Sequence, residues 1–160
     1  MDVSRTAYNI RLAKKEHAYW LKCADALVRG RSVGKKCIPA YREQSLSSEW
    51  LYEHSDELSQ LYQKIDESEV DLFHFDIVEQ IGILRYEMHE IYLELFRRYF
   101  PETNTSFFAN LFNLKRKISD QEESDAKELL CEMKRVAEEL ERMLDGLEQS
   151  LFQLCKINST

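Results

Sequence analysis

The side chains best suited to chemistry at neutral pH are four histidines, His17, His54, His74 and His89. A helical bundle forms a metal site where imidazoles or carboxylates from facing helices converge. The spacing supplies no strong pair, because neither His-x-x-x-His nor His-Glu-x-x-His occurs and no histidine follows a glutamate by three residues. A ferritin-like diiron oxidase and haemerythrin-type iron binding are therefore not expected. A core imidazole hydrogen-bonded to a neighbour, or an exposed imidazole, is the simpler interpretation of each histidine.

The cysteines, Cys23, Cys37, Cys131 and Cys155, form no Cys-x-x-Cys pair. A zinc ribbon or a thioredoxin-like redox centre is therefore not expected, and in a reducing cytosol all four should be free thiols. Cys37 follows two lysines, whose charge favours a thiolate. It is either a redox-sensing thiol or an ordinary loop cysteine.

No pattern of catalytic residues is present. The stretch GRSVGKK has three residues between its glycines, where a phosphate-binding loop needs four, and lacks the serine or threonine that must follow the lysine. No nucleophile has a base at a spacing that indicates activation. We expect no enzyme.

Composition excludes several other classes. The 160 residues suit one domain, residues 1–160, and the 32% of charged residues with only four glycines and two prolines favour an all-α protein. No signal peptide or membrane-spanning run is apparent, which predicts a cytoplasmic protein with no membrane partner. Residues 1–42 hold ten Lys/Arg against three Asp/Glu, but the net charge of −7 argues against a nucleic-acid partner.

Apolar spacing predicts the elements that must position these residues. The predicted pieces are helices over residues 4–29, 45–65, 70–100 and 119–157, a basic loop over 30–46, and a short helix with its connection over 101–118. Gly30 is placed to end the first helix, and Ser119 with Glu122 resembles a capping box for the last. We expect an antiparallel four-helix bundle with an additional short helix.

Two features of these helices bear on function. His17 replaces an apolar residue in the seam that runs from Ile10 to Leu27, so we expect it to be buried. The last helix has coiled-coil-like spacing, from which we expect a homodimer, although packing within one chain would produce the same pattern.

Aromatic residues around the end of the third predicted helix fall partly off its main seam. They suggest a second apolar face that would bind a protein partner. The members are Tyr92, Phe96, Tyr99, Phe100, Phe107, Phe108 and Phe112.

The stretch EHAYWLKCADALVRG, with His17, Trp20, Leu27 and Gly30, resembles the start of the bacterial chemoreceptor zinc-binding (CZB) domain. That family is a helical bundle in which three histidines and one cysteine hold zinc. In the second motif Trp50 matches, while Ser45 stands in place of the cysteine. The resemblance implies zinc as the cofactor. The candidate ligands here are His17, Cys37, His74 and His89.

Together these features favour a non-enzymatic regulatory or sensory module that acts through contact with a protein partner. A ligand, metal or redox event near His17 would alter how the first and third helices pack. The alternative is a structural adaptor or chaperone-like bundle that binds its partner without any ligand.

Overall fold

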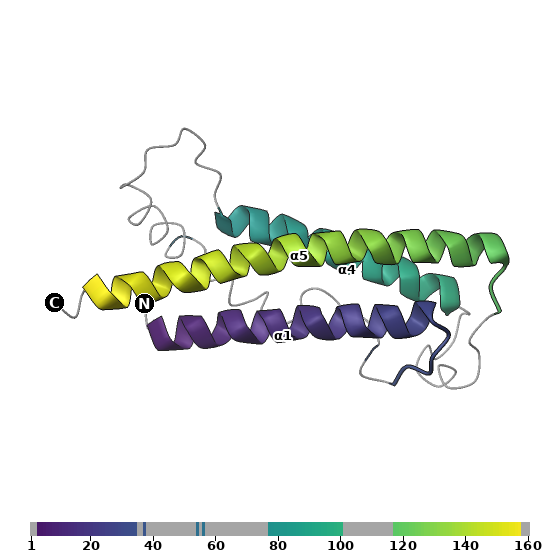
Figure 1. The fold of residues 1–160 in the computed structure, drawn as a ribbon, viewed down its shortest axis with the longest axis horizontal. Coiled ribbons are helices and arrows are strands. Elements are labelled where there is room, and N and C mark those ends of the chain that lie inside the picture. The colour runs from purple at the N-terminus through teal and green to yellow at the C-terminus, as the bar shows by residue number, and fades with distance from the viewer. Residues whose placement is uncertain are drawn as a thin grey trace.

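The computed structural model describes residues 3–34, 37, 54, 56, 77–100 and 117–157. Within these ranges the chain is all-α, as predicted, and forms helices α1 (Val3–Val28), α4 (Ile77–Tyr99) and α5 (Asp120–Ile157). The three helices pack along a shared long axis (Figure 1), and each contacts the other two. Helix α5 runs antiparallel to α1 and α4.

Helix α1 confirms the helix predicted over residues 4–29. Ile10, Ala24 and Leu27 are fully buried, which is the seam expected from their spacing. The helix ends where Gly30 adopts a φ of 72°, a left-handed conformation that glycine adopts at little cost. The amide of Gly30 then donates to the carbonyl of Leu27 and that of Arg31 to the carbonyl of Ala26, at 3.0 and 2.8 Å, which is the Schellman pattern. This turn sends the chain back along α1.

Helix α5 begins at the predicted capping box. The Ser119 amide donates to Oε2 of Glu122 at 2.8 Å, and the Glu122 amide donates to Oγ of Ser119 at 3.3 Å. Its apolar seam is buried against α1 and α4 of the same chain, so packing within the chain accounts for the coiled-coil-like spacing. The fully buried residues of this seam are Ala126, Met133, Val136, Leu140, Leu144, Leu147 and Leu151.

The described part of the chain contains three helices, so it supports an all-α bundle but not the four-helix arrangement. The helix predicted over 45–65 lies outside the described residues apart from positions 54 and 56, and most of the 101–118 connection also lies outside them. The helix predicted over 70–100 is described from Ile77. No described helix is both long and apolar enough to cross a membrane.

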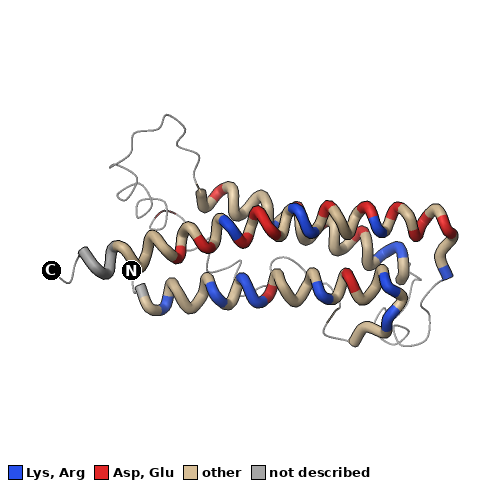
Figure 2. The backbone as a smooth tube through the Cα atoms, viewed as in Figure 1, with Lys and Arg blue, Asp and Glu red and all other residues tan. Residues whose placement is uncertain are grey.

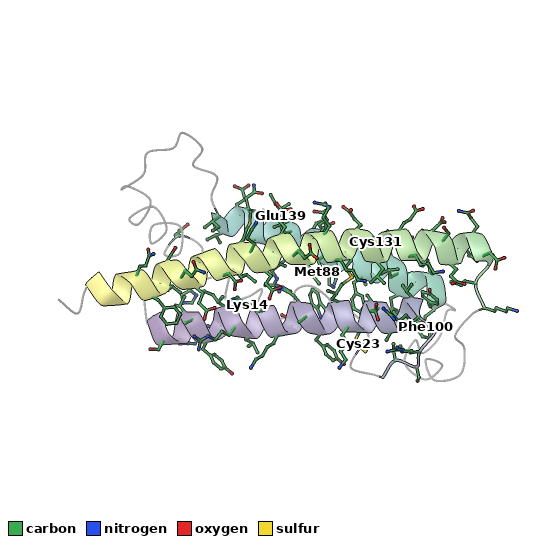
Figure 3. The ribbon with its side chains drawn as sticks, in the orientation of Figure 1. Lys14, Cys23, Met88, Phe100, Cys131 and Glu139 are labelled. Atoms are coloured by element: carbon green, nitrogen blue, oxygen red, sulfur yellow. A yellow bond between two sulfur atoms is a disulfide. The ribbon has the colours of Figure 1, made fainter. Side chains whose placement is uncertain are left out.

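Charge complementarity joins α1 to α5. Basic residues are spread along α1 and acidic residues along α5 (Figure 2). Lys14 lies between the two helices (Figure 3), where it pairs with Asp145 and, at 2.5 Å, with Glu148. Glu148 also accepts a hydrogen bond from Nε of Arg11 at 2.6 Å. Part of the excess positive charge of residues 1–42 is therefore neutralised by acidic residues of α5 inside the bundle.

Candidate thiol–disulfide site at the end of helix α1

Cys23 and Cys37 form a disulfide, with their Cα atoms 5.5 Å apart. The prediction that all four cysteines are free thiols is therefore wrong for this pair. Cys131, exposed on α5, is free as expected, and Cys155 lies outside the residues whose side chains are described. The pair forms because the Gly30 turn reverses the chain and returns Cys37 to helix α1.

The two sulfurs differ in their access to solvent. Cys23 belongs to the core and is only 2% exposed, whereas Cys37 is partly exposed. Thiol–disulfide exchange requires an external thiolate to reach a sulfur. Cys37 is therefore the sulfur open to attack, and Cys23 is the protected partner.

We call residues 31–34 together with Cys37 the strap. Its Val33 and Cys37 pack against the core, and the Cys37 amide donates to the carbonyl of Gly34 at 2.9 Å. The hydroxyl of Tyr92, on α4, donates a hydrogen bond to the carbonyl of Cys37, and Tyr19 Oη lies 3.6 Å from Sγ of Cys37. The strap is thus fixed covalently to α1 and by a hydrogen bond to α4.

An aromatic cluster formed by α1, α4 and the following Phe100 contacts the strap through Tyr92. The Trp20 ring stacks on Tyr92 with a centroid distance of 6.4 Å and an interplanar angle of 12°. Tyr92 contacts Phe96 edge to face at 6.5 Å, and Phe96 contacts Phe100 at 4.8 Å. Burial, and secondarily the nearby Tyr19 hydroxyl, raises the pKa of Tyr92 above its ordinary value. The Tyr92 hydroxyl therefore stays protonated and able to donate to the strap.

His17 lies at the other side of this cluster and is buried, as the seam predicted. It is 5% exposed, and its ring centroid is 5.7 Å from that of Trp20. Burial, aided by the positive charge of Arg85, lowers the pKa of His17 to about 3, so the imidazole is neutral at physiological pH. Its Nε2 is buried without a hydrogen-bond partner among the described residues. The expected hydrogen bond to a neighbour is therefore absent at this nitrogen.

A buried arginine, paired with a partly exposed glutamate, accompanies His17 at the α1/α4 contact. Arg85 is 7% exposed, and its Nη2 lies 3.6 Å from Oε2 of Glu16. A guanidinium in such surroundings needs a compensating charge, which Glu16 supplies. The apolar spacing did not predict that Arg85 is buried, because an arginine among apolar residues interrupts the pattern.

The predicted zinc ligands do not gather in the described part of the chain. His17 and His89 both contact Trp20, at ring distances of 5.7 and 5.5 Å, but Cys37 is bonded to Cys23. His74 lies outside the described residues. No group of three or more His, Cys, Asp or Glu residues that could hold a metal occurs among the residues described.

The aromatic residues proposed as an exposed partner face are buried where the structure describes them. Tyr92, Phe96, Tyr99 and Phe100 are between 1% and 8% exposed. They are core residues in this conformation because α4 packs against both α1 and α5, which covers two of its faces. Phe107, Phe108 and Phe112 lie outside the described residues. A partner can reach the first four only if the bundle opens.

Comparisons with known proteins give no further guidance. No family model, no curated protein and no solved structure matches this chain. Function is therefore argued from the site itself.

Proposed function

We propose that this chain is a non-enzymatic regulatory module whose contact with a protein partner is controlled by the redox state of Cys23 and Cys37. The observation that carries the proposal is the disulfide between a core cysteine of α1 and a partly exposed cysteine of the strap. The strap also accepts a hydrogen bond at the Cys37 carbonyl from Tyr92, whose ring stacks on Trp20 and contacts Phe96 edge to face.

The switching step is ordinary thiol–disulfide exchange. An external thiolate attacks Sγ of Cys37, forming a mixed disulfide and releasing the thiolate of Cys23, which takes up a proton. A second external thiol then resolves the mixed disulfide. In total two external thiols become one external disulfide, and both cysteines become thiols. The same reaction in reverse, driven by a small disulfide, restores the closed state.

Opening follows because the strap depends heavily on this bond. After reduction it is held by the Tyr92 hydrogen bond and by the partly buried contacts of Val33 and Cys37, and a single net hydrogen bond contributes only about 1 kcal/mol. Departure of the strap exposes Tyr92, and more of the partly buried Trp20 that stacks on it, as an apolar patch suited to a protein partner. In the cytoplasm expected from the sequence, the closed state would form when an oxidant appears.

Quantitative capture of partners from the source cell tests this proposal. Three baits are compared: the oxidised protein, the protein kept reduced, and the double variant Cys23→Ala/Cys37→Ala, which cannot close. Cys131→Ser serves as the matched control, because Cys131 is exposed and unpaired. We expect one protein to be enriched on the reduced and double-variant baits, to be depleted on the oxidised bait, and to bind the control according to its redox state.

The alternative, a structural adaptor without a switch, predicts equal capture by all baits whatever their redox state. That result would overturn the regulatory proposal. The partner sought is a protein, and a second copy of this chain would be recognised by its own mass in the eluate.

A further inference from the structure

Two tyrosine hydroxyls contact Cys37, and they contact different atoms of it. The buried Tyr92 donates a hydrogen bond to the backbone carbonyl of Cys37. The exposed Tyr19 places its Oη 3.6 Å from the sulfur of Cys37. Tyr92 therefore holds the backbone of the strap, whereas Tyr19, which solvent reaches, contacts the sulfur that an external thiolate attacks.

The direction of the Tyr19 hydrogen bond follows from the disulfide. A sulfur bonded to another sulfur carries no hydrogen, so Sγ of Cys37 accepts and the Tyr19 hydroxyl donates. Tyr19 stands four residues before Cys23 on α1, so helix geometry places both side chains on the same face. The helix that carries the protected sulfur therefore also places a hydrogen-bond donor at the accessible one.

A donor at this sulfur favours attack by a thiolate. During exchange one negative charge is shared by the incoming sulfur, Sγ of Cys37 and Sγ of Cys23. A hydrogen bond to a sulfur that shares this charge is stronger in the transition state than in the neutral disulfide. Only such a difference between transition state and ground state lowers a barrier.

We propose that Tyr19 accelerates the redox switch by donating a hydrogen bond to Sγ of Cys37 while an external thiolate attacks that atom. The inference rests on the proposed function, because it assigns a role within the same exchange reaction. The bond from the external sulfur to Cys37 forms as the Cys23–Cys37 bond breaks. The electron pair of the broken bond passes to Sγ of Cys23, which takes up a proton from water, and Tyr19 keeps its own proton.

The rate of reduction of the oxidised chain by dithiothreitol at pH 7 tests this role. Samples are quenched in acid and labelled with N-ethylmaleimide, and mass spectrometry counts the labels on each chain. Tyr19→Phe should be reduced about fivefold more slowly, which is the change that corresponds to one net hydrogen bond. Tyr8→Phe is the matched control, since Tyr8 is an exposed tyrosine near the start of α1, and it should be reduced at the natural rate.

The equilibrium between disulfide and dithiol separates this role from simple support of the strap. In mixtures of reduced and oxidised dithiothreitol, Tyr19→Phe should keep the equilibrium constant of the natural chain within about twofold, because a catalytic contact changes rates and not the end states. A hydroxyl that only holds the strap would give the opposite pattern, with faster reduction and an equilibrium shifted towards the dithiol.

Reduction of Tyr19→Phe at the natural rate or faster would overturn the role of Tyr19. It would leave the proposed function standing, because capture of the partner is measured separately in the fully oxidised and fully reduced states. A disulfide of the natural chain that dithiothreitol cannot reduce without denaturant would overturn both.

Discussion

At the scale of single residues, His17 shows what apolar periodicity can and cannot predict. Its place in the seam between Ile10 and Leu27 was predictable, because a helix buries one face whatever residue stands there. Its neutral state and its neighbour Arg85 were not, because they depend on how α1 and α4 are rotated against each other. Apolar spacing in a sequence predicts which face of a helix a residue lies on, but not which residue of a neighbouring helix it will contact.

The lowered pKa of His17 predicts a specific pH dependence of stability. In the unfolded chain the imidazole takes up a proton near its ordinary pKa of 6.5, whereas in the fold it does so only at about 3. Between these values the unfolded state binds more protons, so His17 contributes a loss of stability as pH falls from 6.5 towards 3. The slope reaches about 1.4 kcal/mol per pH unit.

Urea unfolding of the natural chain and of His17→Gln at several pH values between 7 and 4 measures this contribution. Subtracting one curve of unfolding free energy against pH from the other cancels the contributions of the other titrating groups, which both proteins share. The free energy of unfolding of the variant should fall less steeply with decreasing pH. Parallel curves would mean that His17 titrates normally in the fold.

The disulfide marks the limit of residue-scale inference. Nothing in the spacing of Cys23 and Cys37 indicates a bond, because 14 residues separate them and no Cys-x-x-Cys pattern occurs. Gly30 was correctly placed as a helix end, but a helix end alone does not say in which direction the chain continues. The pairing of Cys23 with Cys37 depends on the direction of the chain after Gly30, which only the structure shows.

At the scale of elements, prediction was most successful where local rules act alone. The bounds of α1 and the start of α5 follow from the Gly30 terminus and the Ser119 cap, which are set by neighbouring residues. The aromatic residues of α4 that were assigned to a partner-binding face are buried in this conformation, because a helix that contacts two others buries more of its circumference than a single seam predicts.

The contact between α1 and α5 depends on a partly buried carboxylate. Burial raises the pKa of Glu148, but hydrogen bonds from Lys14 and Arg11 outweigh it and bring the pKa below its ordinary value. Glu148→Gln should lower the free energy of unfolding by about 1 kcal/mol or somewhat more, because both cations lose their shared partner. Chemical denaturation at neutral pH measures this change.

Glu132→Gln is the matched control for that substitution. Glu132 pairs with Arg135 on the same helix at 2.7 Å, and both side chains are about half exposed. Exposed pairs of this kind contribute little, so no measurable change is expected. Equal effects of the two substitutions would contradict a special role for Glu148 in joining the helices.

At the scale of the whole molecule, the strap connects α1 covalently and α4 by a hydrogen bond at the end of the bundle where the polypeptide leaves α1. A cross-link that closes a loop of about 15 residues restricts the unfolded chain and stabilises the fold by about 3 kcal/mol. Reduction should therefore lower the free energy of unfolding by about that amount.

Urea unfolding with and without dithiothreitol measures this difference. Cys131→Ser should show the same difference as the natural chain, whereas Cys23→Ala/Cys37→Ala should be insensitive to the reductant. An equal midpoint for the oxidised and reduced natural chain would show that the bond has no influence on the fold.

The most direct test of the central claim is the accessibility of Trp20 in the two redox states. In a Trp50→Phe background, Trp20 is the sole tryptophan of the chain, and acrylamide quenching of its fluorescence reports its exposure. If reduction releases the strap, the quenching constant should rise by about twofold or more. It should already be high, with or without reductant, in Cys23→Ala/Cys37→Ala. An identical constant in the oxidised, reduced and double-variant proteins would contradict the account, because the exposure of Trp20, which is partly buried in the closed state, would then not depend on the two cysteines.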